Sequence, residues 1–430
     1  MRILHCGAGP GRCVRPRQIL CPRHPLFAFF WMFMPLRLRL LAAVALALLV
    51  ASGCASDPLA TPPREPPSDA AADSLLQQIH AQHTVPALAT VIVRADSVVA
   101  VGAAGVRHRD RPAPVSVHDA FHLGSNTKAM HATLIALLVE AGRLTWDTTP
   151  AEVLPGLADT VHPDFAQVTL AQLLAHRSGL APFTQMSAYQ DVPGLDGPPK
   201  AQRLAFSMHL LQNAPAHAPD SAFVYSNAGY GVSAAMAEQA TGIPWETLMR
   251  ERLFAPLGIR GGFGWPATAD STQPWGHRYR YGRLQPDDPN SPHQLSPVVA
   301  PAGDVHMSMP DYGRFLQLHL RGLRGEPTAL LTPEAIQHLH TSQGPMRAGE
   351  GAPGYGLGWA IQRVAGAPIS SHTGSIGTFK ARAAIQASHN LAVAVVANAG
   401  DDEADAVTDT LRGALLRQYQ TAPSASQPVP

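Results

Sequence analysis

Lysine is almost missing from this chain. Of its 32 Lys and Arg residues, only Lys128, Lys200 and Lys380 are lysines. Arginine keeps its proton at any useful pH, whereas a buried lysine can lose one. Since arginine is the ordinary cation here, a lysine draws attention to its position as one where arginine could be unsuitable, and Lys128 stands three residues after Ser125.

Cysteine is absent beyond residue 54. The four cysteines, Cys6, Cys13, Cys21 and Cys54, all lie in the first 54 residues. The rest of the chain can therefore hold neither a disulfide framework nor a cysteine-based metal site.

The chain also lacks a strong charge of either sign. Its formal net charge of +1 gives no reason to expect nucleic acid or an acidic polymer as a partner. Its 20 histidines show no metal-ligand spacing such as His-Glu-x-x-His. We expect no metal and no other cofactor, and we expect histidines such as His338 and His340 to lie on the surface or in loops.

A targeting segment precedes the folded body. Arg37 and Arg39 come before the apolar run 40–50, and small residues then lead to Cys54. A charged start, an apolar core and small residues before the cut are typical of a bacterial secretory signal, and a cysteine at the cut resembles a lipoprotein signal with Cys54 as the lipidated residue. An ordinary signal peptide or a membrane anchor is the alternative, although the run is short for a membrane span.

The expected organisation follows from this signal. We place the protein in the bacterial cell envelope, facing the periplasm and anchored in the outer membrane by lipid on Cys54. The Pro-rich stretch after Cys54 indicates an extended tether. The segments are a non-native upstream extension at 1–33 (translation would start at Met34), a signal peptide at 34–53, a tether at 54–72, one folded domain at 73–420 and a loose tail at 421–430.

Strand patterns occur at both ends of the folded domain, with helices and Pro/Gly-rich loops between them. This arrangement predicts an α/β (α+β) fold, in which both chain ends form one antiparallel sheet with flanking helices and an inserted helical region. A capping box at Thr169–Gln172 predicts a short helix. The other expected elements are helices at 73–83 and 402–419, a hairpin of strands 88–93 and 97–101, and strands at 356–362, 381–387 and 391–397.

The pair Ser125 and Lys128 opens an apolar helix. Residues 129–139 are apolar on nearly every face, which predicts a buried helix that ends near Gly142. Residues i and i+3 share one helix face, and burial lowers the pKa of a lysine, so Lys128 could act as the base for Ser125. The alternative is a capping serine beside a lysine whose charged end reaches solvent.

Two later motifs extend this pattern, namely Tyr225-Ser226-Asn227 and His372-Thr373-Gly374-Ser375. With Ser125-Asn126-Thr127-Lys128 they follow the order Ser-x-x-Lys, Tyr-x-Asn, (Lys/His)-Thr-Gly. In this order the chain resembles the serine β-lactamase and penicillin-binding-protein superfamily, in the branch of class C β-lactamases, D-alanyl-D-alanine carboxypeptidases and family VIII esterases. Segments that support the resemblance are 142–147, 168–180 and 301–303.

The resemblance implies a role for each motif residue. Ser125 would attack a carbonyl and form an acyl-enzyme, with Lys128 and Tyr225 sharing the role of base. Asn227 would bind Lys128 and the substrate amide. Backbone N–H groups of Ser125 and Ser375 would form the oxyanion hole, Thr373 would contact the substrate, and Gly374 would let the strand approach it.

His372 departs from the lysine that most β-lactamases of this branch have. A mostly neutral histidine would hold a substrate carboxylate weakly or in a pH-dependent way, and histidine here resembles esterases and some carboxypeptidases of the branch. We therefore expect a serine hydrolase acting on a small-molecule or peptide ester or amide. The alternatives are a D-alanyl-D-alanine carboxypeptidase or β-lactamase acting on cell-wall peptides or β-lactams, and a non-catalytic envelope-binding lipoprotein.

Overall fold

The computed structural model describes residues 67–189, 192–291, 294–364 and 366–420. The expected upstream extension, the signal peptide, Cys54 and the tail lie outside these residues, so the predictions made for them stay predictions. No helix of the described residues combines the length and the apolar character that a membrane span requires.

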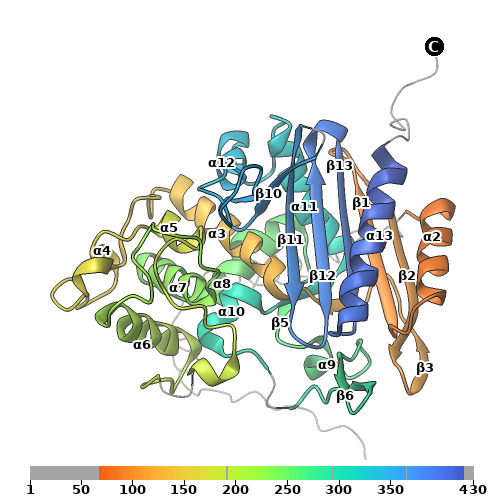
Figure 1. The fold of residues 1–430 in the computed structure, drawn as a ribbon, viewed down its shortest axis with the longest axis horizontal. Helices are drawn as coiled ribbons and strands as arrows, with labels where there is room; N and C mark the ends of the chain where they lie inside the picture. The colour runs from red at the N-terminus through yellow and green to blue at the C-terminus, as the bar shows by residue number, and fades with distance from the viewer. Residues whose placement is uncertain (1–66, 190–191, 292–293, 365, 421–430) are drawn as a thin grey trace, which may run out of the picture. The chain divides into compact units, whose positions relative to one another are not determined.

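Eight antiparallel strands form the central sheet, in the order β3-β2-β1-β13-β12-β11-β10-β9 (Figure 1). Strand β1 pairs with β2 on one side and with β13 on the other. The prediction that the two chain ends complete one antiparallel sheet is confirmed. The strands are β1 Ala87–Val93, β2 Val98–His108, β3 Arg111–Pro114, β9 Gly354–Tyr355, β10 Ala360–Val364, β11 Ala367–Ser375, β12 Lys380–Gln386 and β13 Leu391–Ala397.

Helices cover both faces of this sheet. Every residue of β1 and β13 is buried, which is typical of strands with a packed layer on each side. Along β13, Val393 and Val395 pack in the layer with α2 (Ala70–Ala81) and α13 (Asp402–Gln420), which Figure 1 shows beside the sheet. The alternate residues of β13 pack in the layer with α11 (Met309–Leu323).

The segment between β3 and β9 forms the helical region and two small sheets. One sheet has the order β4-β8-β5, and the other is the hairpin β6-β7. Their strands are β4 Ala120–His122, β5 Gly262–Phe263, β6 His277–Arg280, β7 Arg283–Pro286 and β8 Val305–Ser308. The further α-helices are α3 Thr127–Glu140, α4 Pro150–Val153, α5 Leu170–Leu174, α6 Pro199–Gln212, α7 Asn227–Thr241, α8 Trp245–Leu248, α9 Pro266–Ala269, α10 Ala300–Gly303 and α12 Pro333–Leu339. The 3₁₀-helices are η4 Gly124–Asn126, η5 Pro163–Phe165, η6 Met186–Tyr189, η8 Ala255–Leu257, η9 Pro297–Val299 and η10 Ala387–His389, and η7 Met249–Phe254 is a π-helix.

Helix α3 is buried as predicted. Eleven of its fourteen residues are buried, and it ends before Gly142, whose φ of 66° lies in the left-handed region that glycine favours. The capping box of α5 is also confirmed, since Thr169 and Gln172 each accept a backbone N–H of the other.

Two element boundaries differ from the prediction. Helix α2 starts at Ala70, inside the expected tether, because the Asp69 side chain caps it by accepting N–H groups of Ala71 and Ala72. The expected strand at 356–362 is wrong in its first half. Gly358 has a φ of 84°, and a Cβ there would lie 2.8 Å from the Lys128 carbonyl, so this segment is a turn packed on α3 and only β10 follows as a strand.

The expectation that the histidines lie on the surface or in loops is also wrong for several of them. His340 is buried and donates from Nε2 to Nδ1 of His319 at 2.9 Å, while its own Nδ1 accepts the Ser370 hydroxyl at 2.7 Å. His319 in turn donates from Nε2 to Thr133, at 3.0 Å, and the Thr133 hydroxyl donates to the Ala129 carbonyl. Each ring donates once and accepts once, which is what a neutral imidazole can do. We call Ser370, His340, His319 and Thr133 the histidine chain.

Candidate active site

The first motif lies where the 3₁₀-helix η4 runs into α3. Ser125 is in η4 and Lys128 is in the first turn of α3. The Thr127 hydroxyl donates to the Gly124 carbonyl at 2.7 Å, which ties η4 to α3. Lys128 is fully buried, whereas Ser125 is only half-buried. The amine is therefore shielded from water at a point where the serine can still meet a substrate.

Three oxygen atoms surround the amine of Lys128. Its Nζ lies 2.8 Å from Asn227 Oδ1, 2.8 Å from the Ala302 carbonyl and 3.3 Å from Ser125 Oγ. The two carbonyl oxygens can only accept, so they take the two N–H bonds of a neutral amine. The lone pair of that amine is then directed at the Ser125 hydroxyl, which is the arrangement that a general base needs.

The surroundings of the amine disfavour its charged form. Burial lowers the pKa of Lys128 well below its ordinary value, because a dry environment disfavours the ammonium ion. No carboxylate pairs with Lys128 anywhere in the described residues, so no negative charge there offsets the cost of burying an ammonium ion. The side-chain amide of Asn227 donates to the Phe183 carbonyl at 3.1 Å, which fixes its oxygen toward the lysine.

Tyr225 completes the second motif. Lys128 Nζ lies 4.6 Å from the centroid of the Tyr225 ring. Burial raises the pKa of the Tyr225 phenol, and its hydrogen bond with Ser125 opposes only part of this rise. A phenol that keeps its proton is a poor base, so this direction favours Lys128 as the group that accepts the serine proton.

Strand β11, which carries the third motif, packs closely against η4. A Cβ on Gly124 would lie 2.6 Å from the backbone nitrogen of Ser375, and a Cβ on Gly374 would lie 1.9 Å from the Leu123 carbonyl. Glycine at both positions therefore allows β11 to approach the serine turn. Because Ser375 N is brought beside the turn that carries Ser125, the two backbone N–H groups expected to form the oxyanion hole lie close together.

Side chains alternate along the end of β11. Thr373 and Ser375 are exposed, whereas His372 and Gly374 are buried. The side chain of Thr373 is thus exposed, and its contact with a substrate stays a prediction, while His372 is turned into the core.

The His372 ring is neutral and fully engaged. Its Nδ1–H donates to the Thr373 carbonyl at 2.8 Å, and its Nε2 accepts the Tyr355 hydroxyl at 3.0 Å. Burial, together with the nearby Lys128, lowers the pKa of His372 to about 3. A charged His372 that could hold a carboxylate would therefore require strongly acidic conditions, and any pH dependence of such anchoring falls far below neutrality.

Several residues that build the site carry no local sequence signal. The Ala302 carbonyl belongs to α10, 174 residues from Lys128. His176 is buried, its ring lies 4.4 Å from that of Tyr225, and its Nδ1 accepts the Ser226 N–H at 3.0 Å. The segment 168–180 that supported the resemblance contains His176, but only the fold places it behind the tyrosine.

His122 and Asp304 form hydrogen bonds that hold Gly124, the residue before Ser125. Nε2 of His122 donates to Asp304 Oδ1 at 3.4 Å, and Nδ1 of His122 accepts the Gly124 N–H at 3.1 Å. Burial raises the pKa of Asp304. This contact orients the residue that precedes Ser125. The part of the chain that the structure describes contains no group of three or more His, Cys, Asp or Glu side chains placed to hold a metal ion.

The sequence of the chain is similar to those of known proteins. A family model described as "Beta-lactamase" matches residues 72–418. The chain is 30% identical to Penicillin-binding protein 4 of Amycolatopsis lactamdurans over 315 residues, which are 70% of this chain and 77% of that protein. The resemblance inferred from the three motifs is thereby confirmed.

Solved structures show the same fold. The octameric penicillin-binding protein homologue from Pyrococcus abyssi matches with a TM-score of 0.66 and 24% identity, over 83% of this chain and 79% of that one. The class C beta lactamase from Rhodobacter sphaeroides matches with a TM-score of 0.65 and 19% identity, over 81% of this chain and 100% of that one.

Proposed function

Since the chain belongs to the beta-lactamase family, we propose that it is a serine hydrolase that cleaves an ester or an amide through an acyl-enzyme on Ser125. The observation that carries the proposal is the position of the Lys128 amine. Its two N–H bonds are used by carbonyl oxygens, and its lone pair is left for the Ser125 hydroxyl.

Acylation follows from this geometry. Lys128 takes the proton of the Ser125 hydroxyl while Oγ bonds to the substrate carbonyl carbon. Backbone N–H groups of Ser125 and Ser375 stabilise the negative charge on the carbonyl oxygen, and each such donor contributes about 10²–10³ in rate. The protonated amine of Lys128 then returns the proton, through the Tyr225 hydroxyl, to the leaving oxygen or nitrogen. In the second step a water molecule attacks the carbonyl carbon of the acyl-enzyme ester. The bond from this carbon to Ser125 Oγ breaks, the acid is released, and Ser125 Oγ recovers its proton.

The neutral His372 affects which substrate charge the site favours. Because this ring is uncharged and both of its nitrogens are engaged, it gives a substrate carboxylate no cation beside Ser375. This supports an uncharged ester or amide next to the cleaved bond. The similarity to Penicillin-binding protein 4 supports the second candidate, a D-alanyl-D-alanine peptidase or β-lactamase type of activity.

Intact-protein mass spectrometry tests the proposal. The full chain is mixed separately with p-nitrophenyl butyrate and with benzylpenicillin, and both the protein mass and the remaining substrate are followed. We expect release of nitrophenol from the ester and its loss in the Ser125→Ala variant. A lasting penicillin adduct on the unmodified chain alone would favour the second candidate. Equal turnover by Ser125→Ala would refute the nucleophile.

The cell envelope remains our proposal for the location, through lipid on Cys54. Expression of the full chain with and without Cys54→Ala, followed by membrane fractionation and mass analysis of the mature N-terminus, tests it. A mature protein that begins elsewhere than residue 54 would contradict the lipid anchor.

A further inference from the structure

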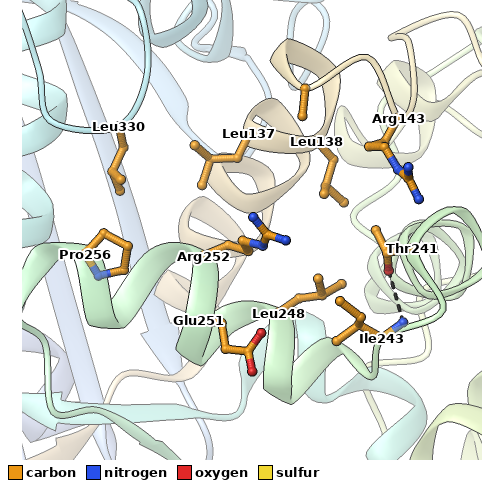
Figure 2. A pocket seen from close by; sticks show the side chains of 11 residues that line it. Leu137, Leu138, Arg143, Thr241, Ile243, Leu248, Glu251, Arg252, Pro256 and Leu330 are labelled. Atoms are coloured by element: carbon orange, nitrogen blue, oxygen red, sulfur yellow. Dashed lines mark hydrogen bonds between the residues drawn. The ribbon is translucent and has the colours of Figure 1, made fainter.

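A cavity of about 500 Å³ opens at the end of α3 that is remote from the serine (Figure 2). It lies between the C-terminal turns of α3 and α7, the helices α8 and η7, and the loop that precedes α12. Pockets of this size hold small organic ligands. Its apolar lining consists of Leu137, Leu138, Ala141, Ile243, Leu248, Pro256 and Leu330.

Charged groups border this apolar lining. Arg143 and Arg252 bring two positive charges, and Glu251 brings one negative charge. Arg143 donates to the Ala240 carbonyl at 2.8 Å, but the structure records no carboxylate paired with either arginine within the described residues. In Figure 2 the guanidinium of Arg252 lies between Leu137 and Leu248. The border therefore carries one net positive charge without a counter-ion.

The backbone at this border is unusual. Residues Met249–Phe254 form the π-helix η7, directly after α8. A π-helical turn contains an extra residue, is rarely found, and occurs frequently at functional sites. Both Glu251 and Arg252 belong to this turn, so the π-helix sets the position of two of the three charges.

The cavity is separate from the acyl-enzyme site. Ser125 and Leu138 stand at opposite ends of the same helical segment, and thirteen residues at 1.5 Å each put them about 20 Å apart. A ligand in the cavity would thus contact the far end of the helix that carries Lys128, without meeting the serine.

We propose that this cavity binds a carboxylate that carries an unbranched apolar chain, such as a medium-chain fatty acid. The apolar residues take the chain, and Arg252, whose guanidinium lies among them, takes the carboxylate through two parallel hydrogen bonds, while Arg143 adds a second positive charge at the border. Glu251 lies beside them and disfavours ligands with more than one negative charge. The single net positive charge of the border matches a monoanion.

Calorimetric titration of the full chain with decanoate tests the site. Decyltrimethylammonium, with a similar chain and the opposite charge, is the matched probe. We expect saturable binding of decanoate with a Kd below about 1 mM and at least about tenfold weaker binding of the cation. Arg252→Gln should weaken decanoate binding about tenfold and Glu251→Gln should strengthen it severalfold, since each removes one charge beside the carboxylate.

Arg260→Gln is the control, because Arg260 is an exposed arginine that does not line the cavity. It should leave binding unchanged, and thermal unfolding would verify that each variant is folded. Equal binding of the two probes, no saturable binding of decanoate, or unchanged binding in a folded Arg252→Gln variant would each overturn the proposal. None of these outcomes depends on catalysis by Ser125.

Discussion

Lys128 and the histidine chain both lie in the core beside α3, and burial keeps both without charge. Burial lowers the pKa of His319 to about 3 and that of His340 well below its ordinary value, just as it lowers the pKa of Lys128. They differ in their hydrogen bonds. Every ring nitrogen of His319 and His340 has a partner within the core, whereas the lone pair of Lys128 faces a half-buried serine hydroxyl.

A lowered pKa therefore does not by itself mark a catalytic group. In the histidine chain each donor and acceptor is satisfied, so protonation can only disrupt packing. At Lys128 the facing hydroxyl belongs to the half-buried Ser125, which can pass its proton to the amine when it meets a substrate. Each place contains a nitrogen that faces a serine hydroxyl, but Ser370 is buried whereas Ser125 is half-buried and can meet a substrate. The following changes test this difference in order of decreasing effect.

Replacement of the catalytic amine should have the largest effect. Lys128→Arg should lower the acylation rate by about 10³-fold, because a guanidinium does not accept the serine proton and a positioned base contributes about 10²–10⁴. Burst kinetics with an ester substrate measure this rate. Lys380→Arg is the control, since Lys380 pairs with Asp405 at 3.4 Å and arginine can keep that pair. A fully active Lys128→Arg enzyme would show that the amine is not the base.

A carboxylate beside the amine should convert Lys128 from a base into an ion-pair partner. Asn227→Asp would favour the ammonium form and raise the pKa of Lys128. The rate near pH 7 should fall about 10²-fold and recover partly as the pH rises through the new pKa, because deprotonation restores the lone pair. A pH–rate profile that keeps its shape and position would contradict this reading.

A break in the histidine chain should affect stability instead of catalysis. His319→Leu leaves the Nε2–H of His340 without its acceptor and removes the N–H that the Thr133 oxygen accepts, and should lower the free energy of unfolding by about 1–3 kcal/mol. Denaturant titration measures it, with the exposed His118→Gln as control. The acylation rate of the folded variant should change less than about threefold. A loss of rate as large as that of Lys128→Arg would remove the contrast.

Acid should destabilise the fold through the same histidines. Their pKa is lower in the native state than in the unfolded chain, where it is about 6.5. Between about pH 6.5 and the native pKa the unfolded chain binds more protons, so stability is full above pH 6.5 and falls with decreasing pH.

The expected slope is up to about 1.4 kcal/mol per pH unit for each histidine. The groups that face His319 and His340 are each other, Thr133, Ser370 and the rings of Phe315 and Trp359, and neither hydroxyl nor either of these rings carries a charge. Denaturant titrations at several pH values should show a shallower slope for His319→Gln than for the unmodified chain. Identical slopes would exclude His319 as a contributor.

Local patterns predicted the elements whose residues decide their own conformation. The alternating, β-branched run of β13, the hairpin of β1 and β2, the capping box of α5 and the buried helix α3 are all found within a few residues of the expected bounds. The strand expected at 356–362 is wrong in its first half because the segment contains Gly358. The close packing of Gly358 on α3 is a contact of the folded structure that the local sequence does not indicate.

The candidate site was foreseeable only in part, and for the same reason. Ser125 and Lys128 are neighbours on one helix turn, so their proximity follows from the sequence. Asn227 was assigned to Lys128 through the resemblance, since 99 residues separate the two. The contact of Asp304 with His122 spans 182 residues and that of Ala302 with Lys128 spans 174, and no local pattern indicates either.

By itself the sequence determined which side chains are capable of the chemistry. A rare lysine one helical turn from a serine, within an apolar helix, already limits the pair to a base and its nucleophile or to a cap. Only the tertiary structure supports our proposal of a base and its nucleophile over a cap, because a pKa and the direction of a lone pair depend on the neighbours of the amine in space. Those neighbours are Asn227 and the Ala302 carbonyl, brought from distant parts of the chain to a point that excludes water.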